Sequence, residues 1–335
     1  MPLMKFDDII KDLKNKVYHP VYFLMGEETY SIDVIADFIE DNVLDEAEKE
    51  FNFTMLYGKD VDMQTVISHA KRYPMMANHH VVIVKEAQNM NKIDELGSYL
   101  DNPQKSTILV ILYKYKTVDK RTNFAKKLQK GGVLFESKKL YDNEIPKWIT
   151  DYVKKQGYSI DPRAVQMLAE YLGADIGKIV NEVGKLFINT PKGSEITLKH
   201  IEENIGISKD YNVFELQKAL GQKNSFKAFQ IVKYFEDNPK SNPNAMILAL
   251  LFSYFSKILI YHSLKDKSSK NVAAALSVNP FFVNDYITAA KKYPSAKVID
   301  IISLIREYDL KSKGVGNINV SDGQLLKELI YKILN

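Results

Sequence analysis

The chain of 335 residues contains no cysteine, and its six histidines form no recognisable ligand pair. The absence of cysteine excludes disulfide bonds, thiolate chemistry and cysteine metal sites, and it fits a reducing cytoplasm, which is the location we expect. His79 and His80 are adjacent, but neighbours at a strand edge point to opposite faces and are poor joint ligands. We therefore expect no metal site and no cofactor.

Catalytic and membrane motifs are missing as well. The sequence has no GxSxG elbow, serine triad order or paired-carboxylate motif, and the lone GxG at Gly314 follows a predicted helix, so we interpret it as a turn. Asp7 and Asp8 stand where a signal peptide would be basic and then apolar. The most apolar segment, residues 245–255, falls short of the roughly 20 residues of a membrane span. We expect a buried helix there, no catalytic residue and no membrane partner.

What is present is the composition of an ordinary globular protein, with 45% hydrophobic and 26% charged residues. The length predicts two to three domains. The net charge of +4, from 46 basic and 42 acidic residues, is mildly compatible with nucleic acid but does not demand it.

Strands and helices alternate as far as about residue 137. The predicted strands cover residues 21–25, 51–56, 80–84, 107–112 and 133–135, and the predicted helices lie near 31–44, 62–72, 91–100 and 119–129. Asp62 and Asn91 are the expected N-caps of two of these helices. Alternation of this kind predicts a parallel sheet with helices on both faces.

After about residue 140 the strand signal stops and helical patterns continue. Asp142 or Asn143 is expected to cap the next helix, and Asp161 precedes a proline as the N-cap of another. Near the end of the chain, Ser321 opens a capping box. We predict an α/β domain over residues 1–140, a small helical domain over 141–208 and an all-helical domain over 211–335.

The first strand, turn and helix have the layout of a nucleotide-binding unit. The turn at Gly26 lacks the second glycine and the lysine of a GxxxxGK[ST] phosphate loop, and Glu27 and Glu28 put negative charge where a phosphate would bind. Lys85 follows the third strand, where nucleoside triphosphatases carry a Mg²⁺-binding aspartate. Taken alone, these features also suit an ordinary acidic helix start and a plain core strand.

Basic residues concentrate between positions 114 and 130, where seven of them oppose a single acidic residue, Asp119. A patch of this kind suits contacts with a DNA backbone. The candidates for these contacts are Lys114, Lys116, Lys120, Arg121, Lys126, Lys127 and Lys130. A solvated helix face explains the same charge pattern.

The order of these features resembles the clamp-loader delta subunit family of bacterial DNA polymerase III over essentially the whole chain. The resemblance rests on residues 21–28, 72–85, 119–121 with Glu136, 144–158, 171–175 and 307–314. It implies an α/β plus all-α fold, with an AAA+-like parallel-sheet domain whose nucleotide site is vacant, a small helical lid domain and a C-terminal helical collar bundle. Gly177 stands near the place where active relatives carry an arginine directed at the nucleotide.

The resemblance also implies a function and its partners. Members of the family bind the sliding clamp and open its ring for loading onto primed DNA, have no ATPase activity of their own, and join the clamp-loader ATPase and delta-prime subunits through the collar. The clamp-binding residues implied here are Tyr73, Pro74, Met75, Met76 and Asn78, and the two methionines match the family's exposed hydrophobic pair. Because Pro74 ends a predicted helix and a strand begins near His80, we expect this pair on a surface connection, the alternative being that it folds back onto the domain.

Two other hypotheses remain open from the residues. One is an active AAA+ nucleoside triphosphatase of DNA metabolism with an atypical phosphate loop, which the missing lysine and Lys85 oppose. The other is an unrelated helical adaptor that binds DNA through residues 114–130, which charge alone does not exclude.

Overall fold

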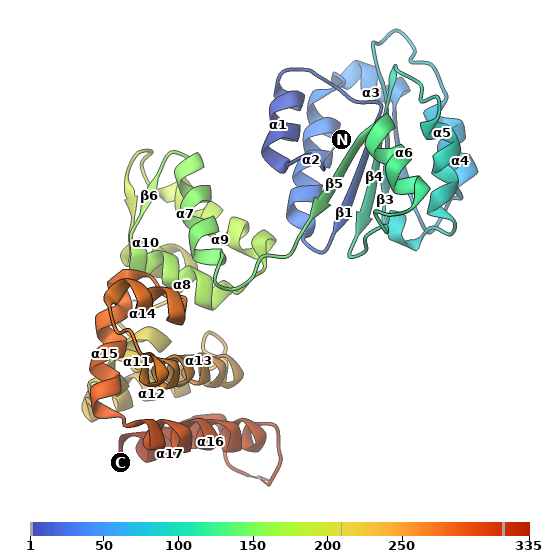
Figure 1. The fold of residues 1–335 in the computed structure, drawn as a ribbon. Coiled ribbons are helices and arrows are strands. Elements are labelled where there is room, and N and C mark those ends of the chain that lie inside the picture. Colours follow the sequence, from blue (N-terminus) through green and yellow to red (C-terminus); the bar gives the residue numbers. More distant parts are fainter. Residues whose placement is uncertain (1–2, 209, 317–318) are drawn as a thin grey trace. The chain divides into compact units, whose positions relative to one another are not determined.

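The computed structural model describes residues 3–208, 210–316 and 319–335, and the chain divides into two compact units, Met1–Leu140 and Tyr141–Asn335 (Figure 1). Residues 1–2 of the predicted first domain and 317–318 of the predicted third domain lie outside the described residues. The predicted helical segments 141–208 and 211–335 are both parts of the second unit.

The first unit is built on a five-stranded parallel sheet with the strand order β2-β3-β4-β1-β5. Its strands are β1 (Val21–Gly26), β2 (Phe53–Tyr57), β3 (His80–Lys85), β4 (Thr107–Lys114) and β5 (Val133–Ser137). Every residue of β1 is buried, because helices cover both faces, and this explains the continuous apolar run in its sequence. The predicted parallel sheet is confirmed.

Helices lie on both sides of this sheet (Figure 1). They are α1 (Phe6–Lys14), α2 (Thr29–Asn42), α3 (Glu46–Asn52), α4 (Met63–Ala70), α5 (Gly97–Leu100) and α6 (Asn123–Gly131), with the 3₁₀ turns η1 (Ala87–Asn89) and η2 (Ile93–Leu96). Successive residues of a strand point to opposite faces. Tyr22 and Leu24 of β1 therefore pack with residues of α1 and α2, whereas Phe23 and Met25 pack with residues of α4, α5 and α6.

Some boundaries predicted for this unit are wrong. The strand predicted from residue 51 begins at Phe53, because a capping box of Asp45 and Glu48 starts α3, which runs through Asn52. The helix predicted from residue 119 begins at Asn123, since Thr122 supplies the cap.

The predicted N-caps of two helices have different outcomes. The carboxylate of Asp62 accepts a hydrogen bond from the Thr65 N–H at 2.8 Å, so this cap of α4 is confirmed. Asn91 is not a cap, because the predicted helix 91–100 is a 3₁₀ turn followed by one α-helical turn. Lys92 precedes it with a left-handed φ of 52°.

The second unit begins with helices α7 (Ile145–Lys155), α8 (Pro162–Leu172), α9 (Ile176–Asn189) and α10 (Leu198–Ile205). Asp161 caps α8 as predicted, accepting a hydrogen bond from the Arg163 N–H at 2.6 Å. The predicted cap of α7 is wrong, because Glu144 occupies that position. A parallel pair of strands, β6 (Ser159–Ile160) and β7 (Glu195–Ile196), was not predicted, since two residues carry no periodicity.

A helical bundle completes the second unit. Its helices are α11 (Val213–Gly221), α12 (Ser225–Asp237), α13 (Asn244–Ser263), α14 (Ser269–Leu276), α15 (Val283–Lys292), α16 (Ser295–Ser312) and α17 (Asp322–Leu334), with the turn η3 (Pro280–Phe282). The capping box of Ser321 and Gln324 opens α17 as predicted. Buried side chains from all seven of these helices form one hydrophobic core.

Helix α13 is longer than the predicted segment 245–255. Its 20 residues make it the one helix of the described chain that is long and apolar enough to cross a membrane. Ile247, Leu251, Phe255 and Ile258 are nevertheless buried in the bundle core. In this fold α13 is a core helix, as expected.

Candidate functional site

The turn after β1, where a phosphate loop would lie, is closed by neighbouring main chain. The Gly26 N–H donates to the Lys116 carbonyl at 3.1 Å, and the Gly26 carbonyl accepts from the Tyr115 N–H at 2.8 Å. Gly26 has a φ of 129°, and a Cβ there would collide with the carbonyl oxygen of Ser137. Glycine is therefore required for close packing at this turn.

The N-terminus of α2 is occupied by a carboxylate from the same turn. Oε1 of Glu28 accepts a hydrogen bond from the Tyr30 N–H at 2.9 Å. A phosphate loop would instead offer its free N–H groups and a lysine to an anion at this place. The residues between positions 26 and 31 do not fit a nucleotide phosphate.

The ends of β3 and β4 face the acidic side of α2. Lys85 Nζ lies 3.9 Å from Oε2 of Glu40, and Lys114 Nζ lies 2.6 Å from Oδ1 of Asp33. Burial and the neighbouring carboxylates raise the pKa of Asp37. Across the described residues there is no group of three or more His, Cys, Asp or Glu side chains placed to hold a metal ion. These ion pairs oppose the hypothesis of an active nucleoside triphosphatase.

Gly26, Lys85 and Lys114 lie where the carboxyl ends of the parallel strands meet, which we call the carboxyl edge of the sheet. The predicted clamp-binding residues lie at the opposite, amino edge, on the connection between α4 and the amino end of β3. Tyr73 is 77% exposed, Met75 63% exposed and Met76 fully exposed, while Pro74 is half-buried and Asn78 exposed. The expected surface connection is confirmed, and the methionine pair does not fold back onto the domain.

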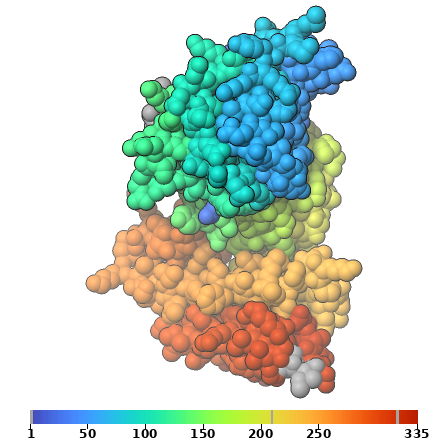
Figure 2. All heavy atoms as spheres, turned by 90° about the vertical axis from the view of Figure 1, so that its right-hand side faces the viewer, coloured from blue at the N-terminus to red at the C-terminus, as the bar shows by residue number. Residues whose placement is uncertain are grey.

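The main chain of this connection is hydrogen-bonded to a buried side chain, although Met75 and Met76 at its tip are exposed. The buried side chain of Asn52 accepts a hydrogen bond from the Met75 N–H at 2.6 Å and donates one to the Met75 carbonyl at 2.9 Å. Further along, the rings of Tyr18 and His79 meet edge to face with centroids 5.2 Å apart. In Figure 2 the blue segment around residues 71–79 lies beside the darker blue segment that contains Asn52, at the upper edge of the first unit. Met76 has a left-handed φ of 55°, which a non-glycine residue adopts only when its surroundings impose it.

Three histidines flank the same connection. Burial lowers the pKa of His69, His79 and His80, and for His80 the charge of Arg72 adds to this effect. The side chain of His80 is buried against the amino edge of the sheet. The lowered pKa values favour the neutral form of these imidazoles near pH 7.

The basic segment is not one free patch. Lys114 ends β4, Lys116, Lys120 and Arg121 lie in the following loop, and Lys126, Lys127 and Lys130 lie on α6. Lys114, Lys120, Arg121 and Lys127 form ion pairs with Asp33, Glu136, Asp119 and Asp101, respectively, and Lys116 donates to the carbonyl of Gln88. In the part of the chain that the structure describes, only Lys126 and Lys130 of the seven candidates lack such a partner, and both are exposed on α6.

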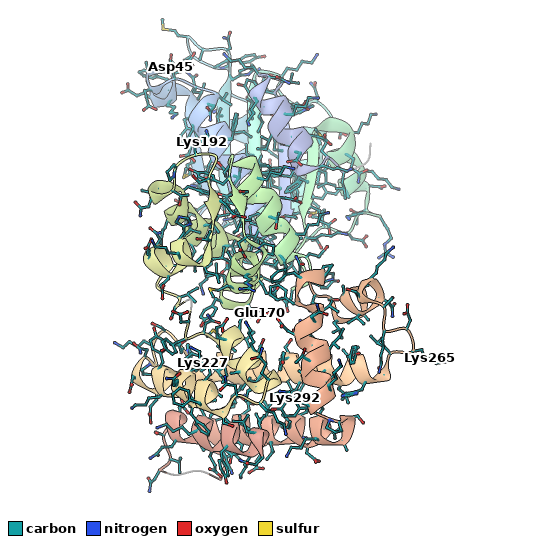
Figure 3. The ribbon with its side chains drawn as sticks, turned by 90° about the vertical axis from the view of Figure 1, so that its left-hand side faces the viewer. Asp45, Glu170, Lys192, Lys227, Lys265 and Lys292 are labelled. Atoms are coloured by element: carbon teal, nitrogen blue, oxygen red, sulfur yellow. The ribbon has the colours of Figure 1, made fainter. Side chains whose placement is uncertain are left out.

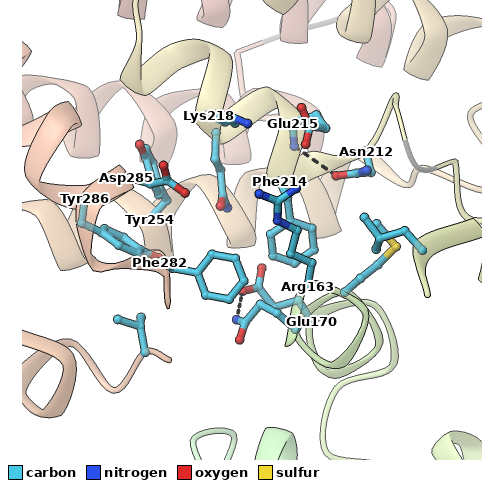
Figure 4. A pocket seen from close by; sticks show the side chains of 15 residues that line it. Arg163, Glu170, Asn212, Phe214, Glu215, Lys218, Tyr254, Phe282, Asp285 and Tyr286 are labelled. Atoms are coloured by element: carbon cyan, nitrogen blue, oxygen red, sulfur yellow. Dashed lines mark hydrogen bonds between the residues drawn. The ribbon is translucent and has the colours of Figure 1, made fainter. Parts of the chain in front are cut away.

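The second unit contains a cavity of about 80 Å³ lined by residues of α8, α11, α13 and α15 (Figure 4). Glu170 on α8, which is labelled in Figure 3 and Figure 4, lines this cavity. Burial raises the pKa of its carboxyl to about 6. Pockets for drug-sized ligands usually measure about 300–1,000 Å³, so this cavity is too small for a nucleotide. It is a small, mostly apolar gap inside the unit.

Sequence patterns did not reveal two contacts that shape these sites. The capping role of Glu28 has a local signal, a carboxylate just before the first helical turn. Asn52 has a weaker one, a polar amide between Phe51 and Phe53. Its partner, Met75, is 23 positions away, so no spacing rule points to it.

Two family models match the chain. The model described as DNA polymerase III, delta subunit, matches residues 22–138, and the model of the DNA polymerase III delta subunit, C-terminal domain, matches residues 210–331. The DNA polymerase III subunit delta of Bacillus subtilis (strain 168) is 27% identical over 337 residues, which cover 96% of this chain and 94% of that protein.

A solved structure is similar over the same length. The Bacillus subtilis DNA clamp loader delta protein has 27% sequence identity and a TM-score of 0.57, and the match covers 98% of this chain and 99% of that one. The predicted fold class, an AAA+-like parallel-sheet domain with a helical lid and a helical collar, is confirmed by this similarity. The chain belongs to the DNA polymerase III delta subunit family.

Proposed function

We propose that this chain is the clamp-loader subunit that binds the sliding clamp and opens its ring for loading onto primed DNA. The observation that carries the proposal is the exposed pair Met75 and Met76 at the tip of a connection whose backbone is held in place. Exposed apolar side chains on a fixed connection are costly unless a partner covers them.

The pair is large enough to anchor an interface. Burying two methionine side chains contributes roughly 3–6 kcal/mol, at about 1.5–3 kcal/mol each. That contribution would dominate a modest interface as a hot spot, with Tyr73, Pro74 and Asn78 around it. The flexible, polarisable thioether adapts well to a hydrophobic pocket.

Ring opening requires no ATP hydrolysis by this chain. A subunit that binds the open or strained clamp more tightly than the closed one shifts the clamp population toward the open state. The closed turn at Gly26 and the capping of α2 by Glu28 support a chain without nucleotide chemistry of its own. The energy of the cycle would then come from the ATPase subunits of the loader.

The second unit is proposed to join the ATPase and delta-prime subunits in a collar. Large apolar side chains are exposed on several helices of its bundle, among them Phe226 on α12 at 76%, Phe252 on α13 at 49% and Ile299 on α16 at 53%. Primed DNA would contact the assembled loader, and the chain would act in the cytoplasm. Because Phe226 is already exposed, replacing it by serine should weaken loader assembly in a pull-down without loss of folding.

The test of the proposal is Met75→Ala combined with Met76→Ala, with clamp affinity measured by surface plasmon resonance. We expect affinity to fall at least about tenfold while the thermal midpoint is unchanged, since each lost side chain removes more than about 1.4 kcal/mol of burial. Ile188→Ala is the matched control, because Ile188 is 82% exposed in the second unit. Unchanged affinity of the double variant would remove the pair from the clamp site.

A further inference from the structure

We propose that Asn52 is a positioning residue that holds the Met75–Met76 tip in the conformation that its partner binds. This inference rests on the proposed clamp binding and adds to it a buried residue that does not itself touch the clamp. Asn52 is 1% exposed and lies at the end of α3, directly before β2. In the sheet register Phe53 pairs with Val81, which places Asn52 beside the amino end of β3, where the connection ends.

The side-chain amide of Asn52 both accepts and donates hydrogen bonds. Oδ1 accepts from the Met75 N–H, and Nδ2 donates to the Met75 carbonyl, so both polar groups of the Met75 main chain are bound by one side chain. The same Nδ2 also donates to the Glu48 carbonyl of α3 at 3.1 Å. This pattern needs one acceptor and two donors, which an amide has and a carboxylate lacks.

The fixed main chain of Met75 determines where Met76 points. Met76 takes a left-handed φ of 55° and is fully exposed, so no packing of its own side chain explains this conformation. The constraint comes instead from its two neighbours, since Met75 is hydrogen-bonded to Asn52 and Ala77 packs against the core that the sheet forms with α1 and α2. A loop that already has its bound conformation loses no affinity to competing conformations.

Asn52→Asp is the sharpest test, because it keeps the shape of the side chain and replaces the donor by a second acceptor. A carboxylate oxygen would then face the carbonyls of Met75 and Glu48. Asn238→Asp is the control, since among the described residues Nδ2 of Asn238, at the exposed C-terminal end of α12 in the second unit, makes only the corresponding bond, to the Tyr234 carbonyl four positions earlier at 2.9 Å. If Asn52→Asp lowers the thermal midpoint below the assay temperature, Asn52→Ser replaces it in the same measurements.

Three readouts are needed, all on the full chain: clamp affinity, hydrogen exchange of the Met75 amide, and the effect of Asn52→Asp in the background of Met75→Ala with Met76→Ala. We expect the single variant to lose roughly tenfold in affinity and to exchange the Met75 amide faster, because a buried polar contact is broken. In the double-alanine background the same change should alter affinity by less than about twofold, because Asn52 acts through the methionines.

An equal loss of affinity in both backgrounds would overturn the proposal, because Asn52 would then act through the fold in general. Unchanged Met75 exchange in both Asn52 variants would overturn it as well. If the two methionines prove irrelevant to clamp affinity, the proposed function fails by itself, and faster Met75 exchange would still support the positioning of the tip by Asn52.

Discussion

The two edges of the sheet in the first unit differ in what they expose: the carboxyl edge pairs its polar groups internally, and the amino edge exposes apolar side chains. At the carboxyl edge, the polar groups that could receive a nucleotide are paired within the chain: Glu28 caps α2, Lys85 pairs with Glu40, and Gly26 is packed against main chain. At the amino edge, the main chain of Met75 is also hydrogen-bonded within the chain, but the side chains of Met75 and Met76 are exposed. The carboxyl edge is thus marked by polar groups paired within the chain, and the amino edge by exposed apolar side chains on a hydrogen-bonded backbone.

The largest effect is expected from a charge at the amino edge. Met76→Asp should weaken clamp binding by about 100-fold or more, because the complex would bury an unpaired carboxylate, and the thermal midpoint should stay unchanged because Met76 is fully exposed. Glu27→Lys makes a charge change at the carboxyl edge and should leave affinity unchanged. Because Glu27→Lys changes the net charge in the opposite direction, tighter clamp binding by that variant in a surface plasmon resonance titration, beside weaker binding by Met76→Asp, would mean that overall charge, not the tip, governs binding.

Removing the cap at the carboxyl edge should affect stability and nothing else. Glu28→Ala deletes the acceptor of the Tyr30 N–H and should destabilise the first unit by about 0.5–2 kcal/mol in urea unfolding. Glu27→Ala, at the exposed neighbouring position, is the control. Calorimetry should still detect no Mg-ATP binding, since no lysine or second glycine is present; micromolar binding would show that one carboxylate alone had blocked an otherwise intact site.

Lowering the pH should reduce the stability of the first unit through the histidines at the amino edge. Burial lowers the pKa of His69, His79 and His80 below the ordinary value of about 6.5, so between the lowered pKa and 6.5 the unfolded chain binds more protons than the folded one. Stability of the first unit is therefore present above about pH 6.5 and is lost as the pH falls below it. Urea midpoints measured at about pH 7.5 and 5.5 should fall accordingly, and His80→Gln should reduce that difference; a higher midpoint in acid would contradict the assignment.

The smallest effect concerns DNA. Lys126→Glu with Lys130→Glu should reduce the salt slope of loader affinity for primed DNA by about two, at roughly 0.9 per phosphate contact, because these two lysines have no acidic partner among the residues that the structure describes. Lys120→Ala is the control, since Lys120 already pairs with Glu136. An unchanged slope for the first variant would identify the segment as a solvated face.

The sequence predicted what depends on neighbours along the chain. The five strands of the large sheet, the caps at Asp62 and Asp161 and the exposed connection at Met75 follow from local periodicity and polar signals. The charge count between positions 114 and 130 failed to foresee that Asp33 and Asp101, from other elements, would pair with Lys114 and Lys127. Asn52 escaped prediction for the same reason, because its partner is brought to it by the register of β2 and β3.

The contrast between the two edges can be tested most directly by hydrogen exchange of the full chain, mapped by mass spectrometry with and without the sliding clamp and with and without Mg-ATP. We expect the clamp to slow exchange in residues 71–79, and Mg-ATP to leave residues 26–31 unchanged. Exchange in residues 71–79 that is the same with and without the clamp would contradict the assignment of partner binding to the amino edge. Slower exchange of residues 26–31 in Mg-ATP would contradict the absence of a nucleotide site at the carboxyl edge.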